Sequence, residues 1–114
     1  MLANEQIRGA IVQGIGGALY EECLYDVDGQ LLNGSMADYL VPMSGEMPDI
    51  EVAHVQTLTR SSLLGAKGAG EAGTAGAPAA VMNAINDALR PLDAAVWSQP
   101  FTPEKILRAL GKVD

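Results

Sequence analysis

The chain has 114 residues, of which 48% are hydrophobic and 18% charged, a composition typical of one folded globular domain and not of a disordered segment. Its net charge of -7 leaves no basic patch for phosphates, which argues against nucleic acids and acidic membrane surfaces as partners. The sequence has no apolar run of the roughly 18 residues that span a bilayer and no leader-like start, so it predicts a cytoplasmic protein.

Few side chains in the sequence bind metals. Cys23 and His54 are the only cysteine and histidine, whereas a zinc or iron centre held by protein needs about four nitrogen, sulfur or oxygen ligands. Packing explains both residues more simply, Cys23 as a small apolar group and His54 as a strand residue. The sequence therefore predicts no metal bound directly by the protein, and any metal would arrive inside a cofactor.

The first predicted element is a helix over residues 4–25. Its apolar residues recur at spacings of three and four, the period of a helix with one buried face. Four glycines lie inside it: Gly9, Gly14, Gly16 and Gly17. Each glycine costs about 0.5–1 kcal/mol relative to alanine in a helix. We therefore expect another backbone or a flat ligand to pack too closely here for a Cβ atom.

Short β-structure is predicted next. Residues 23–27 and 30–33 flank Asp28 and Gly29, a dipeptide that favours the positive φ of a tight turn, which predicts a β-hairpin. Residues 33–49 contain scattered glycine and proline and are predicted to be irregular. From residue 50 to about 57, β-branched residues favour a strand.

A second glycine cluster covers residues 65–76 (GAKGAGEAGTAG) and predicts a loop. A stripe of small apolar residues predicts a buried helix from about Thr74 to Arg90, where Pro91 stops it. The loop is therefore expected to lead directly into a helix.

The last predicted helix is the most clearly delimited. Thr102 provides a cap, Pro103 suits the first helical position, and Gly111 ends the helix. Without an internal repeat or a domain boundary, the predicted fold class is α+β. It has about three helices and a small β-sheet in one segment, residues 1–114.

The second glycine cluster has more than one chemical interpretation. Residues 68–73 (GAGEAG) match the G-x-G-x-x-G pattern of dinucleotide-binding loops, but they come late in the chain and place the Glu71 carboxylate where it would repel a pyrophosphate. Glu71 could instead act as a general base on a loop whose glycines let a planar ligand approach the backbone. An exposed glutamate at a glycine-rich helix start is a third explanation, and the pattern alone leaves all three open.

Three segments carry a resemblance to a known family. Residues 65–74 (GAKGAGEAGT), residues 6–22 (QIRGAIVQGIGGALYEE) and residues 34–42 (GSMADYLVP) resemble, in the same order, segments of molybdenum hydroxylase large subunits. This family includes xanthine dehydrogenase, aldehyde oxidase and carbon monoxide dehydrogenase. Residues 77–80 and 102–105 continue the likeness, so it covers nearly the whole chain. Glu5 stands where the family usually has glycine.

The resemblance implies a role for particular residues. Glu71 corresponds to the catalytic base and Gln6 to a glutamine beside the cofactor, while the pterin is lined by five consecutive residues: Ala66, Lys67, Gly68, Ala69 and Gly70. The implied cofactor is molybdopterin, in its plain or cytosine dinucleotide form. The implied reaction hydroxylates aldehydes, purines or N-heterocycles, or oxidises carbon monoxide, with water as the oxygen source.

The resemblance also implies partners. The chain would be the C-terminal part of a larger molybdopterin-binding domain, inactive alone, and would work with iron–sulfur and FAD subunits or domains on a small-molecule substrate. As a fragment it is expected to expose apolar surface and to self-associate. A dinucleotide-binding module and a cofactor-free interaction scaffold remain the alternatives.

Overall fold

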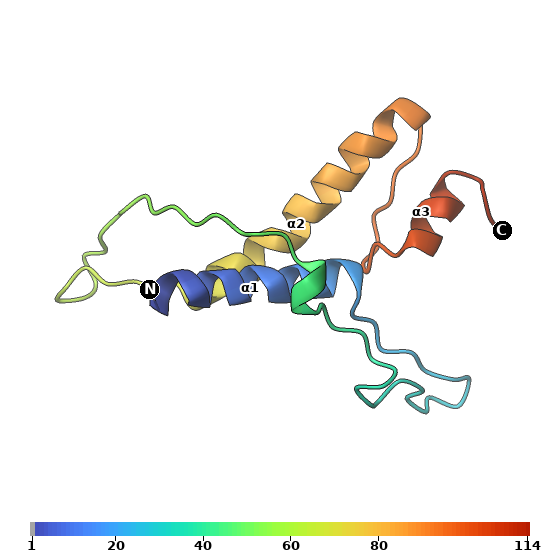
Figure 1. Ribbon diagram of the computed structural model, residues 1–114, viewed down its shortest axis with the longest axis horizontal. Coiled ribbons are helices and arrows are strands. Elements are labelled where there is room, and N and C mark those ends of the chain that lie inside the picture. The colour runs from blue at the N-terminus through green and yellow to red at the C-terminus, as the bar shows by residue number, and fades with distance from the viewer. Residues whose placement is uncertain (1) are drawn as a thin grey trace.

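Three α-helices joined by long irregular segments make up the fold (Figure 1). The computed structural model describes residues 2–114. Helix α1 spans Leu2–Leu19, α2 spans Gly70–Leu89 and α3 spans Pro103–Ala109, and short 3-10 turns lie at Ser44–Glu46 (η1) and Arg90–Leu92 (η2). The three predicted helices are therefore confirmed. None of them is long and apolar enough to cross a lipid bilayer.

Helix α1 ends earlier than predicted, at Leu19 and not near Tyr25. The backbone amides of Tyr20 and Glu21 both donate to the carbonyl of Gly16, each at 2.9 Å, and this closes the last turn. The apolar spacing that predicted the helix stops at the same place, so the residues after Leu19 had no buried face to continue.

Helix α2 begins earlier than predicted, at Gly70 and not near Thr74. More than half of the second glycine cluster is therefore helical, although glycine is a poor helix former. Contacts with α1 favour this conformation, because packing routinely outweighs a propensity of about 1 kcal/mol per residue. As a result, Glu71 lies in the first turn of a helix and not on a loop.

The predicted β-hairpin is reduced to one antiparallel bridge, between Tyr25 and Leu31. The side chain of Asp26 accepts hydrogen bonds from the backbone amides of Asp28 and Gln30, at 2.9 and 2.8 Å. These bonds close the turn locally, and the flanking segments are too short to pair further.

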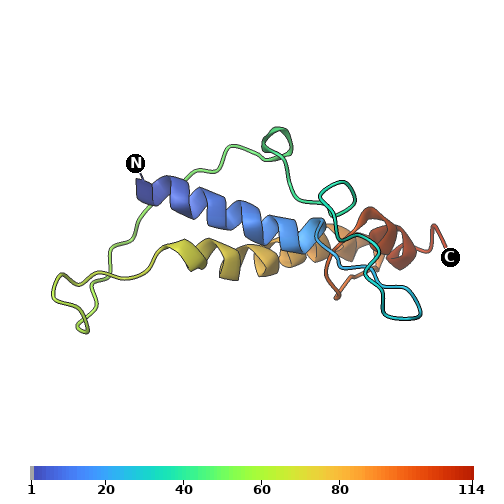
Figure 2. The same ribbon diagram turned by 90° about the horizontal axis from the view of Figure 1, so that it is seen from below.

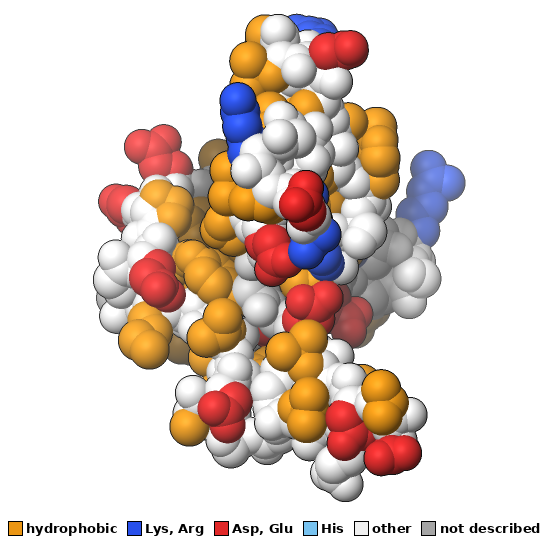
Figure 3. Space-filling model, turned by 90° about the vertical axis from the view of Figure 1, so that its right-hand side faces the viewer, with side chains coloured by type: hydrophobic (Ala, Val, Ile, Leu, Met, Phe, Trp, Pro, Cys, Tyr) orange, Lys and Arg blue, Asp and Glu red, His pale blue; other side chains and the backbone are white. Residues whose placement is uncertain are grey.

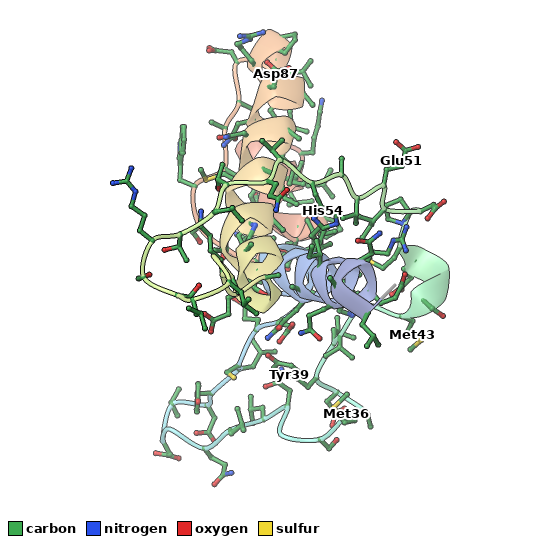
Figure 4. All side chains as sticks on the ribbon, turned by 90° about the vertical axis from the view of Figure 1, so that its left-hand side faces the viewer. Met36, Tyr39, Met43, Glu51, His54 and Asp87 are labelled. Atoms are coloured by element: carbon green, nitrogen blue, oxygen red, sulfur yellow. The ribbon has the colours of Figure 1, made fainter. Side chains whose placement is uncertain are left out.

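The predicted strand over residues 50–57 has no partner strand, so the small β-sheet does not form among residues 2–114. The segment runs past α1 without regular secondary structure (Figure 4). It is the first part of a longer segment, residues 50–69, which we call the arm. Two side chains of α1 hold it: the Arg8 Nε donates to the carbonyl of Ile50 at 2.8 Å, and Asn4 Oδ1 lies 2.7 Å from His54 Nε2. Side-chain contacts here replace the backbone ladder that a sheet requires.

Glycines bring α1 and α2 into direct backbone contact, with both helices running in the same direction (Figure 2). A Cβ added to Gly73 would stand 2.6 Å from the backbone nitrogen of Ile11. A Cβ added to Gly14 would stand 2.8 Å from the Cβ of Ala77. The expectation of a neighbour too close for a Cβ is therefore confirmed at Gly14, and the neighbour is α2.

The other glycines of α1 differ from one another. A Cβ on Gly16 would stand 2.9 Å from the Cδ of Pro42, so the irregular segment after the hairpin packs closely there. Around Gly9 and Gly17, no atom of the described residues lies within 4 Å of the added Cβ. No close protein neighbour is therefore found at these two positions within residues 2–114.

The hydrophobic core lies at the C-terminal ends of α1 and α2, where buried residues from three parts of the chain meet: Ala18, Leu89, Val96 and Phe101. The amide of Phe101 donates to the carbonyl of Ala18 at 2.7 Å. Asn86 donates to the carbonyl of Val96 and accepts from its amide, at 2.9 and 2.8 Å. These bonds tie the segment between α2 and α3 to the helix pair.

Helix α3 begins as predicted. The hydroxyl of Thr102 accepts a hydrogen bond from the amide of Lys105 at 3.3 Å, and Pro103 takes the first helical position. The ammonium group of Lys105 lies 3.3 Å from the carboxylate of Glu22. This pair holds α3 beside the end of α1.

Much of the apolar surface is exposed, as expected for a segment of a larger subunit. Within residues 2–114 only five hydrophobic side chains are buried, whereas Val27, Val55 and Leu63 are almost fully exposed. Hydrophobic side chains also lie at the surface between the acidic ones in Figure 3. The radius of gyration is 17.7 Å, compared with about 13 Å for a compact domain of this length.

The Gly73 contact predicts the effect of adding one methyl group. Gly73→Ala is expected to lower the free energy of unfolding by about 1–3 kcal/mol, because the new Cβ would collide with the backbone of α1. Gly17→Ala is the matched control, since its Cβ meets nothing and the helix gains about 0.5–1 kcal/mol. Thermal unfolding followed by circular dichroism measures both changes. Equal effects of the two substitutions would contradict the close contact.

Candidate functional site

A cleft of about 460 Å³ opens between the N-terminal halves of α1 and α2. Nine residues from the two helices line it: Leu2, Glu5, Gln6, Gly9, Ala10, Gln13, Gly70, Glu71 and Thr74. We call it the Glu71 cleft. Its lining residues lie toward the N-terminal ends of the two helices, whereas the hydrophobic core lies toward their C-terminal ends.

One face of α1 lines the Glu71 cleft. Gln6, Gly9 and Gln13 recur at spacings of three and four, which places them on the same side of the helix. The space beside Gly9 is open. Gly70, the first residue of α2, lies against Gln6, because a Cβ added to Gly70 would stand 3.3 Å from the Gln6 Nε2. The two helices therefore meet at the Gln6 amide.

Glu71 contributes an exposed carboxylate to this cleft from the first turn of α2. The four ion pairs within residues 2–114 all involve other residues. The amides at a helix start favour negative charge, and Ala69, the residue before the helix, provides no side-chain cap for them. The cleft therefore combines a carboxylate with backbone donors and the side-chain amide of Gln6.

A second carboxylate, Glu5, also lines the cleft and forms an ion pair with Arg8 on the next turn of α1. No lysine or arginine is among the described residues that line it. The hydrogen bond from the Tyr39 hydroxyl to Glu21, 2.8 Å long, raises the pKa of Tyr39, and both residues lie outside the cleft.

The residues predicted to line a pterin fall into two clefts. Gln6 and Gly70 share the Glu71 cleft with the predicted base, whereas residues 66–69 line a second cleft of about 770 Å³ formed mainly by the arm. We call this the arm cleft. Ala69 and Ala72 line the arm cleft, and Gly70 and Glu71 line the other, so the two adjoin at the first turn of α2.

Hydrogen bonds close the arm on itself. The ammonium group of Lys67 donates to the hydroxyl of Thr57 at 2.7 Å, and the hydroxyl of Ser62 donates to the carbonyl of Ala66 at 3.1 Å. These bonds join the two limbs of the arm and fix the segment that leads into α2. Lys67 is therefore used within the arm and does not line the Glu71 cleft.

Two polar residues of the cleft were not assigned from the sequence. They are Gln13 and Thr74, to which the family resemblance gives no role. Gln13 stands two turns after Gln6, and Thr74 one turn after Glu71, so helical spacing from the assigned residues would have found both. The Thr74 hydroxyl donates to the carbonyl of Ala10 at 3.1 Å and lies 3.5 Å from the Gln13 Oε1.

The dinucleotide-binding interpretation of residues 68–73 lacks its structural context. Such a loop connects a strand to a helix, but no strand precedes α2 within the described residues. In the same part of the chain, no three side chains of the metal-binding types His, Cys, Asp and Glu gather closely enough to hold a metal ion.

Comparisons with known proteins identify the family of this chain. Residues 1–48 match the family model of the molybdopterin cofactor-binding domain. The nicotine 6-hydroxylase large subunit of Paenarthrobacter nicotinovorans is 46% identical over 114 residues, which are 99% of this chain and 14% of that protein. The chain belongs to the molybdenum hydroxylase family.

Solved structures of this molybdenum hydroxylase family match the whole chain. Quinoline 2-oxidoreductase from Pseudomonas putida 86 superposes with a TM-score of 0.93 at 42% identity. The match covers 100% of this chain and 14% of the quinoline 2-oxidoreductase chain. The Cu,Mo-CO dehydrogenase superposes with a TM-score of 0.88 at 28% identity, over 100% of this chain and 15% of its own. The chain thus spans about one seventh of the length of the proteins it matches.

The Lys67–Thr57 bond predicts how a protease attacks the arm. Thr57→Val is expected to speed cleavage by trypsin after Lys67 about two- to fivefold, as expected for an exposed hydrogen bond worth roughly 0.5–1 kcal/mol. Thr57→Ser keeps the hydroxyl and is expected to behave like the original protein. Mass spectrometry of the fragments over time measures the rate, with cleavage after Arg60 as an internal reference. An unchanged rate in Thr57→Val would show that the bond does not hold the arm.

Proposed function

We propose that this chain forms the wall of a molybdopterin site that carries the catalytic base, and that residues 1–114 belong to the C-terminal part of the molybdopterin-binding domain. The observation that carries the proposal is that Gln6 and Glu71, which lie on different helices, line one cleft. The family resemblance assigns these two residues to the cofactor and to the base. A shared cleft is what both roles require.

The lining of the two clefts fits a flat, polar cofactor. No atom of residues 2–114 lies within 4 Å of a Cβ added to Gly9 or Gly68, so a planar ring could approach the backbone there. The uncapped start of α2 leaves backbone N–H donors for acceptor atoms of a pterin, and the Gln6 amide offers both a donor and an acceptor. We assign Gln6 and Gly70 to one side of the pterin and residues 66–69 to the other.

The chemistry of the site would depend on the transfer of one proton from water to Glu71. When bound, molybdopterin would supply the two-electron oxidation of a substrate C–H bond, with water as the oxygen source. Glu71 would accept, at a carboxylate oxygen, the proton that the water loses. Its place in the first turn of α2 suits a base that begins as an anion. The Gln6 amide would orient the cofactor relative to that carboxylate.

The substrate proposal rests on the relatives. Two of them are named for nicotine and quinoline, which are nitrogen heteroaromatic compounds. A ring carbon next to nitrogen is electron-poor and therefore open to attack by an oxygen nucleophile. We place N-heterocycles before aldehydes, purines and carbon monoxide as substrates of the whole subunit, and we assign the choice among them to residues outside these 114.

The remainder of the large subunit would complete the fold. Residues 50–57 lack a partner strand within the described part of the chain, and we propose that a strand of the remainder pairs with them and forms the predicted small β-sheet. The same remainder would cover the exposed apolar side chains, which would otherwise cause self-association. Iron–sulfur and FAD subunits or domains would carry the electrons away.

Replacement of the proposed base tests this function. In the intact large subunit with its partners, Glu71→Gln is expected to lower kcat for nicotine or quinoline by about 10²–10⁴-fold, because glutamine keeps the size of the side chain but does not accept the proton. Molybdenum content is expected to stay unchanged. Steady-state turnover measures the first quantity and elemental mass spectrometry the second.

Glu51→Gln is the matched control, because Glu51 lies on the arm and points away from the helices in Figure 4. It removes the same charge and is expected to leave turnover unchanged. Full activity of Glu71→Gln at normal molybdenum content would refute the assigned base. A well-folded original complex without molybdenum would favour the cofactor-free scaffold.

A further inference from the structure

One side chain makes every hydrogen bond between α1 and α2 within residues 2–114. The hydroxyl of Thr74 donates to the carbonyl of Ala10 at 3.1 Å, and the Oε1 of Gln13 is a second, more distant acceptor at 3.5 Å. A threonine in a helix commonly bonds to a carbonyl of its own helix one turn earlier. Here the hydroxyl of Thr74 donates to a carbonyl of α1, so the bond connects the two helices.

The position of this bond relative to the cleft is specific. Thr74 follows Glu71 by three residues, which puts the two side chains on the same face of α2, one turn apart. Ala10 follows Gln6 by four residues on α1, again one turn away. The bond between Thr74 and Ala10 therefore lies one turn further along both helices than Gln6 and Glu71, the two residues of the proposed site.

The remaining contacts between the two helices are apolar packing contacts around two glycines. Gly73 lies against Ile11 without a side chain of its own, and Gly14 lies against Ala77 in the same way. The Ile11 side chain lies on Gly73 and the Pro78 ring lies beside Gly14, so these contacts fix the distance between the helices by packing. The bond from Thr74 to the Ala10 carbonyl adds a directional contact to this packing, because the strength of a hydrogen bond depends on distance and angle.

We propose that Thr74 is a positioning residue for the base: its hydroxyl, bonded to the Ala10 carbonyl, holds the Glu71 carboxylate in its working place relative to Gln6. This inference rests on the proposed role of Glu71 and adds to it. Catalytic geometry is sensitive, since a misplacement of about 1 Å can cost on the order of 10²-fold in rate. Thr74 acts through Glu71 and needs no contact with substrate or cofactor.

Thr74→Val is the variant that tests the proposal. Valine has nearly the same shape as threonine and removes the hydroxyl alone, and the Ala10 carbonyl keeps the hydrogen bond of its own helix. In the intact large subunit, with nicotine or quinoline as substrate, kcat is expected to fall by about 10- to 100-fold. KM is expected to change less than about twofold, since substrate binding is not altered. Thr74→Ser keeps the hydroxyl and is expected to restore most of kcat.

Two measurements separate positioning from general destabilisation. Thr102→Val removes the hydroxyl that caps α3, far from the cleft, and is expected to lower the melting temperature without lowering kcat. Molybdenum content is expected to be equal in all variants. Amide hydrogen exchange, which needs no turnover, is expected to rise in residues 70–76 of Thr74→Val and to stay low in Thr74→Ser.

These measurements test the role of Thr74 separately from the proposed function of the site. An unchanged kcat in Thr74→Val, or a loss that Thr74→Ser does not restore, would overturn the positioning role. If the original enzyme converts neither compound, the proposed substrate class fails, and hydrogen exchange then decides on Thr74 alone. Unchanged protection of residues 70–76 in Thr74→Val would overturn the proposal in that case.

Discussion

The close approach of α1 and α2 at Gly73 is the contact on which the rest of the structure depends. Because Gly73 has no side chain, the backbone of α2 lies against the backbone of α1 at Ile11. This approach brings the first turn of α2 beside the first turns of α1 and so creates the cleft that Gln6 and Glu71 share. A larger residue at position 73 would separate the two walls of the candidate site.

The contact also explains why the fold is so open. A pair of helices in backbone contact has little apolar surface to bury between them, and the core forms only where Phe101 returns to the end of α1. The Glu71 cleft and the arm lie at the other end, with few buried side chains of their own. The geometry of the site thus rests on the helix contact and on polar bonds from Arg8, Lys67 and Thr74.

The sequence predicted the helices better than it predicted their exact bounds and the contacts between them. The three helices follow from apolar spacing and capping, and the close neighbour of Gly14 followed from the cost of glycine in a helix. The start of α2 at Gly70 could not be predicted, because it depends on packing that overrides local propensity. The β-sheet was predicted from β-branched residues, but a strand also needs a partner, and none lies in the described part of the chain. Gln6 and Glu71 came from the family resemblance, whereas their common cleft required the fold.

We propose that the Glu71 cleft is a wall of the molybdopterin site. Crystallography of the intact large subunit, with anomalous diffraction recorded on both sides of the molybdenum absorption edge, tests it most directly. We predict a single molybdenum peak beside the Glu71 carboxylate, with pterin density between Gln6 and residues 66–69. A molybdenum peak elsewhere, with the cleft filled by side chains from the rest of the subunit, would contradict it.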